Sequence, residues 1–129
     1  MSVTFVLPIP PGVNNLYPTI RTENGPKRVK SAEYRAWQHE AGWMVPRAAK
    51  GIAPKWFRVG LVFDRPDKGN RADLDGRIKA VLDLLKKHDV IADDRWNEGM
   101  TVEWSSPCTA PFYPANPTVR VTIEPLEAA

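Results

Sequence analysis

The stretch that decides the fold is residues 71–96, RADLDGRIKAVLDLLKKHDVIADDRW. Its apolar residues fall at helical spacing, namely Leu74, Ile78, Val81, Leu82 and Leu85. Such a stripe predicts an amphipathic helix that packs on a larger element. The stripe leaves the acidic residues at its two ends unexplained: Asp73 and Asp75 at the start, Asp93 and Asp94 after it. These acids are therefore the first candidates for function.

The chain as a whole has the size and composition of one ordinary globular domain. It has 129 residues, of which 43% are hydrophobic and 26% are charged, enough to form a single core. We therefore expect one domain that spans residues 1–129. No apolar run is long enough to cross a membrane, no secretion signal opens the chain, and Cys108 has no partner for a disulfide. We expect a cytoplasmic protein with no membrane partner.

The charge is unevenly distributed along the chain. Residues 1–60 carry nine Lys or Arg against three Glu, whereas residues 61–129 carry nine basic against twelve acidic residues. Lys and Arg attract phosphate and carboxylates hold cations, so this pattern fits a metal-using enzyme that acts on a polyanion. An ordinary solvated surface accounts for the same charges equally well.

The rest of the chain predicts a mixed sheet with two main helices, which is an α+β (mixed α/β) fold. Expected strands are residues 2–7, 56–63, 101–104 and 118–124, and a hairpin turns at Asn24–Gly25. The nearly continuous apolar character of residues 56–63 predicts a strand that is buried on both faces. The proline-rich connection at 105–117 predicts a stiff surface loop.

The first helix is expected to begin after Ser31, which is a suitable N-cap, and to end or bend at Pro46. Its apolar residues lie at helical spacing, namely Tyr34, Trp37, Ala41 and Met44. We interpret them as core residues and not as a surface for stacking nucleic-acid bases.

The spacing of the acids limits the geometry they can adopt. Residues two apart on a helix point about 200° apart, so Asp73 and Asp75 converge only if Asp73 precedes the helix. Both carboxylates then lie at the helix N-terminus, with Lys79 one turn from Asp75. A chain reversal after the helix would bring Asp94 back toward that end. The alternative is structural, with Asp73 as a helix cap, Asp75 paired to Lys79, and the later acids in a turn.

Three acids drawn together need a positive partner, because carboxylates about 5 Å apart repel by about 3 kcal/mol per pair. The sequence offers no cluster of His or Cys, so the ligands are oxygen atoms, which favour Mg²⁺ with Mn²⁺ as a substitute. Magnesium binds substrate phosphates, so such a site predicts phosphoryl-transfer chemistry in which a metal-bound water attacks phosphorus. Lys79 would hold the attacking water or the scissile phosphate.

Three motifs of this chain resemble the RusA family, the Holliday-junction resolvases of bacteria and their phages. The first is DLD at 73–75 followed by Lys79 and by VIADD at 90–94. The second is PPGVNNLY at 10–17, similar to the family's opening Pro-Pro-x-x-Asn-Asn segment. The third is Ser31 with YR at 34–35, similar to the start of the family's first helix. The motifs occur in the family's order, and the resemblance covers roughly residues 5–125.

The resemblance implies that Asp73, Asp75 and Asp94 bind the metal ion and that Lys79 is an auxiliary base or phosphate ligand. It also implies a homodimer, of bacterial or phage origin, that makes paired symmetric nicks in four-way junction DNA. Expected DNA contacts come from the asparagines of the opening segment and from basic residues, namely Asn14, Asn15, Lys27, Arg28, Lys30, Lys68 and Arg71. A basic hairpin arm is equally well explained as a solvated edge.

Two positions depart from the family pattern. Gly76 stands where the family usually has Asn after the second aspartate, and Ala72 stands where a basic residue often precedes the first. Arg71 is adjacent and supplies a positive charge there. A second hypothesis, motivated by the basic first half of the chain, is a non-catalytic protein that binds DNA junctions.

Overall fold

Four strands form one mixed sheet in a computed structural model that describes residues 2–11, 19–28, 31–66 and 74–126. The strands are β1 (Val3–Pro8), β4 (Phe57–Phe63), β5 (Asn97–Trp104) and β6 (Thr118–Pro125). Their order across the sheet is β1-β6-β4-β5. β6 pairs antiparallel with β1 and with β4, whereas β4 and β5 are parallel. With two helices beside it, this sheet confirms the expected α+β fold class.

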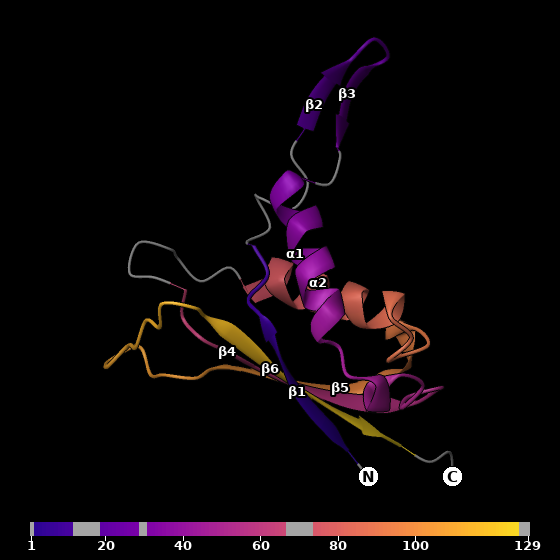
Figure 1. The fold of residues 1–129 in the computed structure, drawn as a ribbon, viewed down its shortest axis with the longest axis vertical. Coiled ribbons are helices and arrows are strands. Elements are labelled where there is room, and N and C mark those ends of the chain that lie inside the picture. Colours follow the sequence, from indigo (N-terminus) through magenta and orange to yellow (C-terminus); the bar gives the residue numbers. More distant parts are fainter. Residues whose placement is uncertain (1, 12–18, 29–30, 67–73, 127–129) are drawn as a thin grey trace.

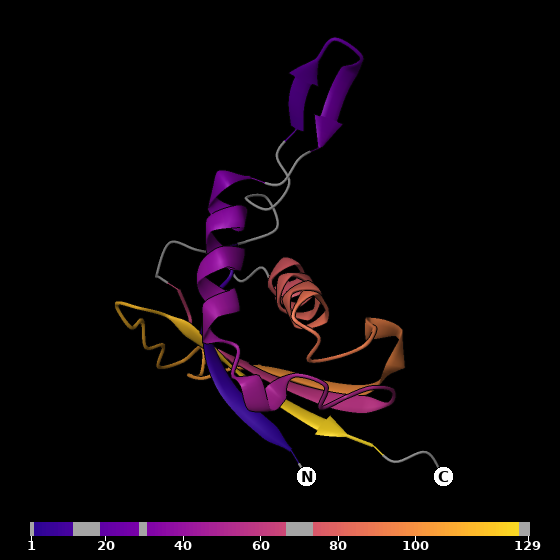
Figure 2. The same cartoon turned by 45° about the vertical axis from the view of Figure 1, so that its right-hand side comes forward.

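Both helices, α1 (Ala32–Met44) and α2 (Leu74–Lys87), cover the same face of the sheet, as Figure 1 and Figure 2 show. Buried and more exposed residues therefore alternate along the strands. In β4 the fully covered side chains are those of Phe57, Val59, Leu61 and Phe63. The expectation that this strand is buried on both faces is wrong. With both helices on one side, its intervening residues face a surface that neither α1 nor α2 covers.

Helix α1 begins and ends as its sequence predicts. The Ser31 hydroxyl accepts a hydrogen bond from the Tyr34 backbone N–H at 2.9 Å, which confirms Ser31 as the N-cap. Tyr34 and Trp37 are buried, and the Trp37 indole donates to the Pro8 carbonyl at 2.8 Å. Met44 is 47% exposed, so its expected place in the core is wrong. The chain leaves the helix there, and Val45 is buried instead.

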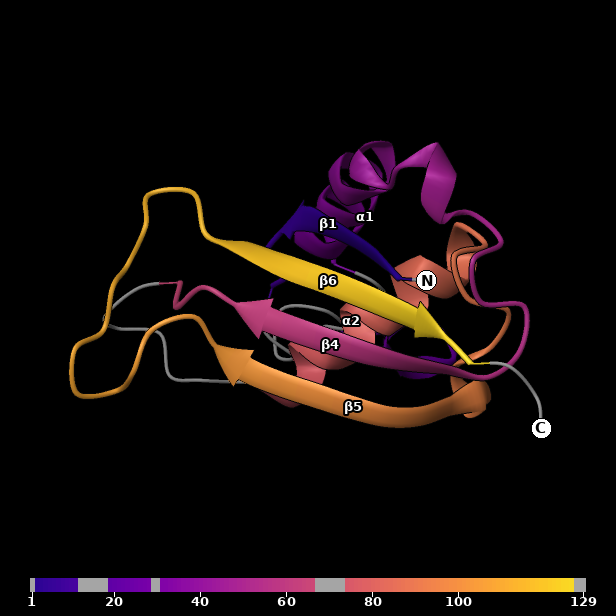
Figure 3. The ribbon, with the colours of Figure 1, turned by 90° about the horizontal axis from the view of Figure 1, so that it is seen from below.

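Helix α2 is the connection between the two parallel strands. Parallel neighbours need a crossover, which here starts at the C-terminal end of β4 and returns to the N-terminal start of β5. The start of α2 therefore lies toward the end of the sheet where β4 finishes. Its last turn lies toward the end where β5 begins (Figure 3). The two ends of α2 thus mark opposite ends of the sheet.

The expected hairpin forms from β2 (Thr19–Thr22) and β3 (Gly25–Arg28), which pair antiparallel. Gly25 has a φ of 104°, a conformation that glycine adopts without strain, so the glycine of the predicted turn is needed there. The hairpin stands beyond the N-terminal end of α1 and away from the sheet (Figure 1). No helix in the described part of the chain has the length and apolar character that a membrane crossing requires.

Candidate metal-binding acids at the two ends of helix α2

The first predicted site group lies at the start of α2. Asp75 is in the first turn of the helix, and its side chain is exposed. Lys79 follows one turn later on the same side of the helix and is also exposed. A carboxylate in the first turn faces the positive end of the helix dipole, which favours its ionised form. Asp73 lies outside the described residues, so its predicted position beside Asp75 stays a prediction.

A buried arginine fixes this end of α2 to the N-terminal part of the chain. Arg77 is only 2% exposed, and its Nε donates to the Pro10 carbonyl at 3.1 Å. The contact holds the segment after β1, which leads into the predicted Asn14 and Asn15, against the helix that carries Asp75. Arg77 is not among the site residues predicted from the sequence. The available signal was its spacing, because it stands three residues after Leu74 and four before Val81, on the helix face expected to be apolar.

The second acidic pair lies beyond the other end of α2. Asp93 caps a short 3₁₀ helix, η3 (Asp94–Trp96), by accepting a hydrogen bond from the Arg95 backbone N–H at 3.1 Å. Its carboxylate also lies 3.7 Å from Lys86 Nζ and 3.8 Å from Arg95 Nε. The hydrogen bond from the Arg95 backbone, first of all, then a hydrogen bond with the Asp94 side chain and the nearby positive charges lower the pKa of Asp93. Asp93 thus has the structural role that the alternative interpretation gave it, whereas Asp94 is an exposed neighbour.

Three contacts place Asp94 near the start of β4 and β5. The Trp96 ring packs edge-to-face on Trp56, with centroids 4.7 Å apart, and Trp56 directly precedes β4. Ile91 forms a parallel bridge with Ala53. One of the ion pairs of Asp93 is with Lys86, in the last turn of α2. The chain after α2 therefore stays at the C-terminal end of the helix and does not return to its start.

One chain alone does not bring Asp75 and Asp94 together. Asp75 and Lys86 are eleven residues apart on α2, which corresponds to roughly 16 Å along the helix axis. Within residues 2–11, 19–28, 31–66 and 74–126, no three His, Cys, Asp or Glu side chains are close enough to hold a metal ion. In the described residues, the chain thus does not reverse toward the start of α2 as expected.

The predicted DNA contacts are only partly within the described residues. Lys27 and Arg28 lie on β3 of the projecting hairpin. The other five lie outside the described residues, namely Asn14, Asn15, Lys30, Lys68 and Arg71. Their roles stay predictions.

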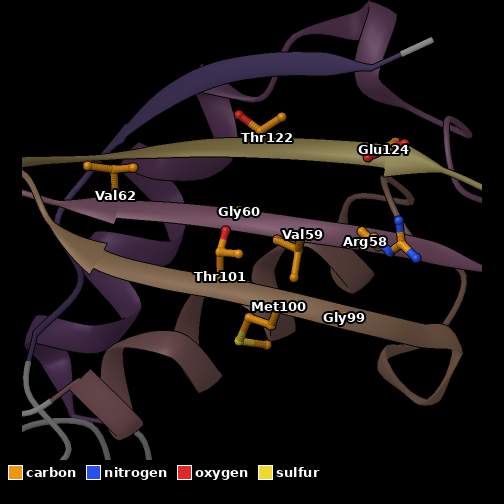
Figure 4. A pocket seen from close by; sticks show the side chains of 9 residues that line it. All are labelled: Arg58, Val59, Gly60, Val62, Gly99, Met100, Thr101, Thr122 and Glu124. Atoms are coloured by element: carbon orange, nitrogen blue, oxygen red, sulfur yellow. The ribbon is translucent and has the colours of Figure 1, made fainter.

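The uncovered face of the sheet has a hollow of about 510 Å³. Its lining comes from β4, β5 and β6 and includes Arg58, Gly60, Thr101 and Glu124 (Figure 4). Gly60 keeps the surface low, since a Cβ there would lie 3.2 Å from Thr101 Oγ1. Among the lining residues Glu124 alone has a carboxylate, so the hollow lacks the oxygen ligands that Mg²⁺ binding requires.

Comparison with protein families gives a match over most of the chain. The family model for endodeoxyribonuclease RusA matches residues 8–124, which include Asp75, Lys79 and Asp94. The chain belongs to the RusA endodeoxyribonuclease family. A comparison with curated proteins gave no match.

Membership in the RusA family confirms the resemblance that the three sequence motifs carry. The family is one of endodeoxyribonucleases that act on Holliday junctions, so the chain is assigned to this class of nucleases. The matched residues include both helices, β4, β5 and nearly all of β6, but only the last residue of β1. In this RusA-family protein, Asp75 and Asp94 thus lie toward opposite ends of one helix.

Proposed function

We propose that the protein is a Mg²⁺-dependent endodeoxyribonuclease that resolves Holliday junctions by paired symmetric nicks. The observation that carries the proposal is the family match over residues 8–124, with the acidic motif of the family retained in the chain. The donor set supports the choice of metal. Asp73, Asp75 and Asp94 offer only oxygen ligands, and Asp75 is exposed at the end of a helix where a substrate phosphate has access.

The separation of Asp75 from Asp94 supports a homodimer. One α2 helix lies between them, so within a single chain they cannot coordinate the same ion. In a two-fold dimer, the start of α2 in one protomer can face η3 of its partner, and the symmetry makes two equal sites. We propose that each site combines Asp73 and Asp75 of one protomer with Asp94 of the other. Two such sites match the two strands that a resolvase cuts.

The residues at the start of α2 have distinct tasks in this proposal. Mg²⁺ would supply an activated water and stabilise charge on the leaving 3′ oxygen. Asp75 holds its carboxylate in the first turn of the helix, where the backbone geometry fixes its direction. Lys79, one turn along, places an ammonium group where it can bind the scissile phosphate. Arg77 is buried, and it positions the Pro10 segment against this helix.

A cleavage assay with a synthetic four-way junction tests the proposal. The wild-type protein should make paired nicks in the presence of Mg²⁺ and none in EDTA. Asp75→Asn should bind the junction with unchanged affinity and lose cleavage, because the amide retains the shape of the carboxylate but not its charge. Cleavage by Asp75→Asn at the wild-type rate would remove this residue from the mechanism. Binding without any metal-dependent cleavage by the wild type would favour the second hypothesis, a non-catalytic junction-binding protein.

A further inference from the structure

The loop between β5 and β6, residues 105–117, is held at both ends by one carboxylate. Asp64 directly follows β4. Its Oδ1 accepts a hydrogen bond from the Ser105 hydroxyl at 2.8 Å. Its Oδ2 accepts from the Thr118 backbone N–H at 2.9 Å and from the Thr118 hydroxyl at 3.1 Å. The first residue of the loop and the residue that follows it are therefore fixed to the end of the same strand.

Further contacts stiffen the loop between these two points. Arg65 Nε donates to the Ser106 carbonyl at 3.1 Å, and its guanidinium lies 5.0 Å from the centroid of the Trp104 ring. Ser106 is buried, and its hydroxyl accepts a hydrogen bond from the Phe112 backbone N–H at 3.0 Å. Four prolines, at 107, 111, 114 and 117, restrict the backbone in addition. The backbone at Phe112 is thus tied to a buried side chain.

Two aromatic side chains nevertheless point into solvent from this anchored loop. Phe112 is 66% exposed and Tyr113 is 38% exposed. Removing large apolar side chains from water is favourable. A fixed loop that exposes two of them is therefore suited to contact a partner. Residues 105–117 contain no charged side chain. No carboxylate within the loop would repel a phosphate backbone.

The loop extends from the end of the sheet where β4 finishes, and the start of α2 lies toward the same end. It leaves β5 after Trp104, which pairs with Phe63 at the end of β4, and returns into β6 beside the same residue. Figure 1 and Figure 3 both place it at this end of the sheet, opposite η3. The loop that carries the exposed aromatics and the start of α2, which carries Asp75, thus lie toward the same end of the sheet.

We propose that Phe112 and Tyr113 stack on base pairs that are exposed at the branch point of the DNA substrate. In the open form of a junction, in which the arms are not coaxially stacked, the last base pair of an arm has no stacking neighbour and presents a flat apolar face. An aromatic ring can replace that neighbour, and such stacking tolerates any base sequence. In a linear duplex every base pair is already stacked, so the same rings gain nothing there. The inference rests on the proposed function, because it assigns a role in recognising the branched substrate.

The test compares affinities for a four-way junction and for a linear duplex of the same length, measured in Ca²⁺ so that binding is separated from cleavage. The double variant Phe112→Ala/Tyr113→Ala should bind the junction about tenfold more weakly than wild type. Its affinity for the linear duplex should stay within about twofold, because the phosphate contacts that dominate duplex binding are retained. Phe112→Leu/Tyr113→Leu keeps the apolar character without the aromatic faces and should resemble the alanine variant. Trp43→Ala, which removes an aromatic side chain that is 80% exposed on α1, is the matched control and should bind both DNAs as wild type does.

The outcomes separate this inference from the proposed function. If the alanine variant binds each DNA with the same affinity as wild type does, and wild type cleaves the junction, the stacking role is overturned and the nuclease assignment stays in place. Full retention of junction affinity by the leucine variant also overturns base stacking. A change in oligomeric state of the alanine variant, measured by sedimentation, with unaltered DNA affinity would assign the loop to protein contacts instead. A wild-type protein that neither binds nor cuts junctions overturns the proposed function and the inference together.

Discussion

The two ends of α2 are built in different ways although both carry acids of the same family motif. The start of the helix rests on Arg77, which is buried and bonded to the Pro10 carbonyl, and leaves Asp75 and Lys79 exposed. The far end is held by apolar contacts of Val90 and Ile91 and by ion pairs on the surface. The first end is thus anchored by a buried side chain, while the predicted site residues beside it stay exposed. At the second end Asp94 is exposed, and in the proposed dimer it would complete a site of the other copy.

Mixing two inactive variants gives the largest effect and tests whether the acids act across a dimer. Asp75→Asn and Asp94→Asn should each lower cleavage by about 100-fold or more, because each removes a charge that the metal site requires. If the site combines Asp75 of one protomer with Asp94 of its partner, a mixed dimer has one site with both substitutions and one intact site. Co-refolded subunits should therefore regain single-strand nicking without paired cuts, as measured on a junction labelled on each strand in turn.

The alternative to be distinguished is a site whose acids all come from one chain. If both acids of a site came from the same protomer, each site of the mixed dimer would lack one of them, and the mixture would stay inactive. Each variant refolded alone provides the baseline. Recovery of nicking in the mixture cannot come from residual activity if each variant alone remains inactive at twice the concentration.

Replacing Arg77 removes the buried anchor at the start of α2. Arg77→Ala should lower the free energy of unfolding by about 3 kcal/mol, because it leaves a cavity and removes a hydrogen bond from a buried carbonyl. Lys86→Ala, at the other end of the same helix, is the matched control. Its ion pair with Asp93 is partly exposed, and such pairs contribute little to stability. Urea unfolding of both variants measures the contrast, and equal losses would refute the difference between the two ends.

The sequence predicted the fold more completely than the site. Periodicity indicates which side chains are buried, whereas the site depends on the direction in which the chain crosses the sheet. The α2 stripe, the Ser31 cap and the glycine of the hairpin turn are local signals, and each is found where expected. β4 has apolar residues at nearly every position, so its pattern did not reveal that one face is uncovered. The position of Asp94 depends on β4 and β5 being parallel neighbours, which forces α2 to span the sheet between the two acids. Strand order is a long-range property that spacing along the chain does not encode.

The smallest effect concerns Asp64, which fixes the loop 105–117 at the same end of the sheet as Asp75. Partial burial acts to raise the pKa of Asp64, but hydrogen bonds from Thr118 and Ser105, together with the charge of Arg120, lower it below its usual value of 3.8. A carboxylate whose pKa is lowered by folding stabilises the protein fully above its unfolded pKa, and this contribution is lost as the pH falls through the folded value. Asp64→Asn should therefore cost about 1 kcal/mol at pH 7. The difference in unfolding free energy between the variant and wild type should narrow as the pH falls below 3.8. A difference that stays constant down to pH 3 would mean that the ionised carboxylate does not hold the loop.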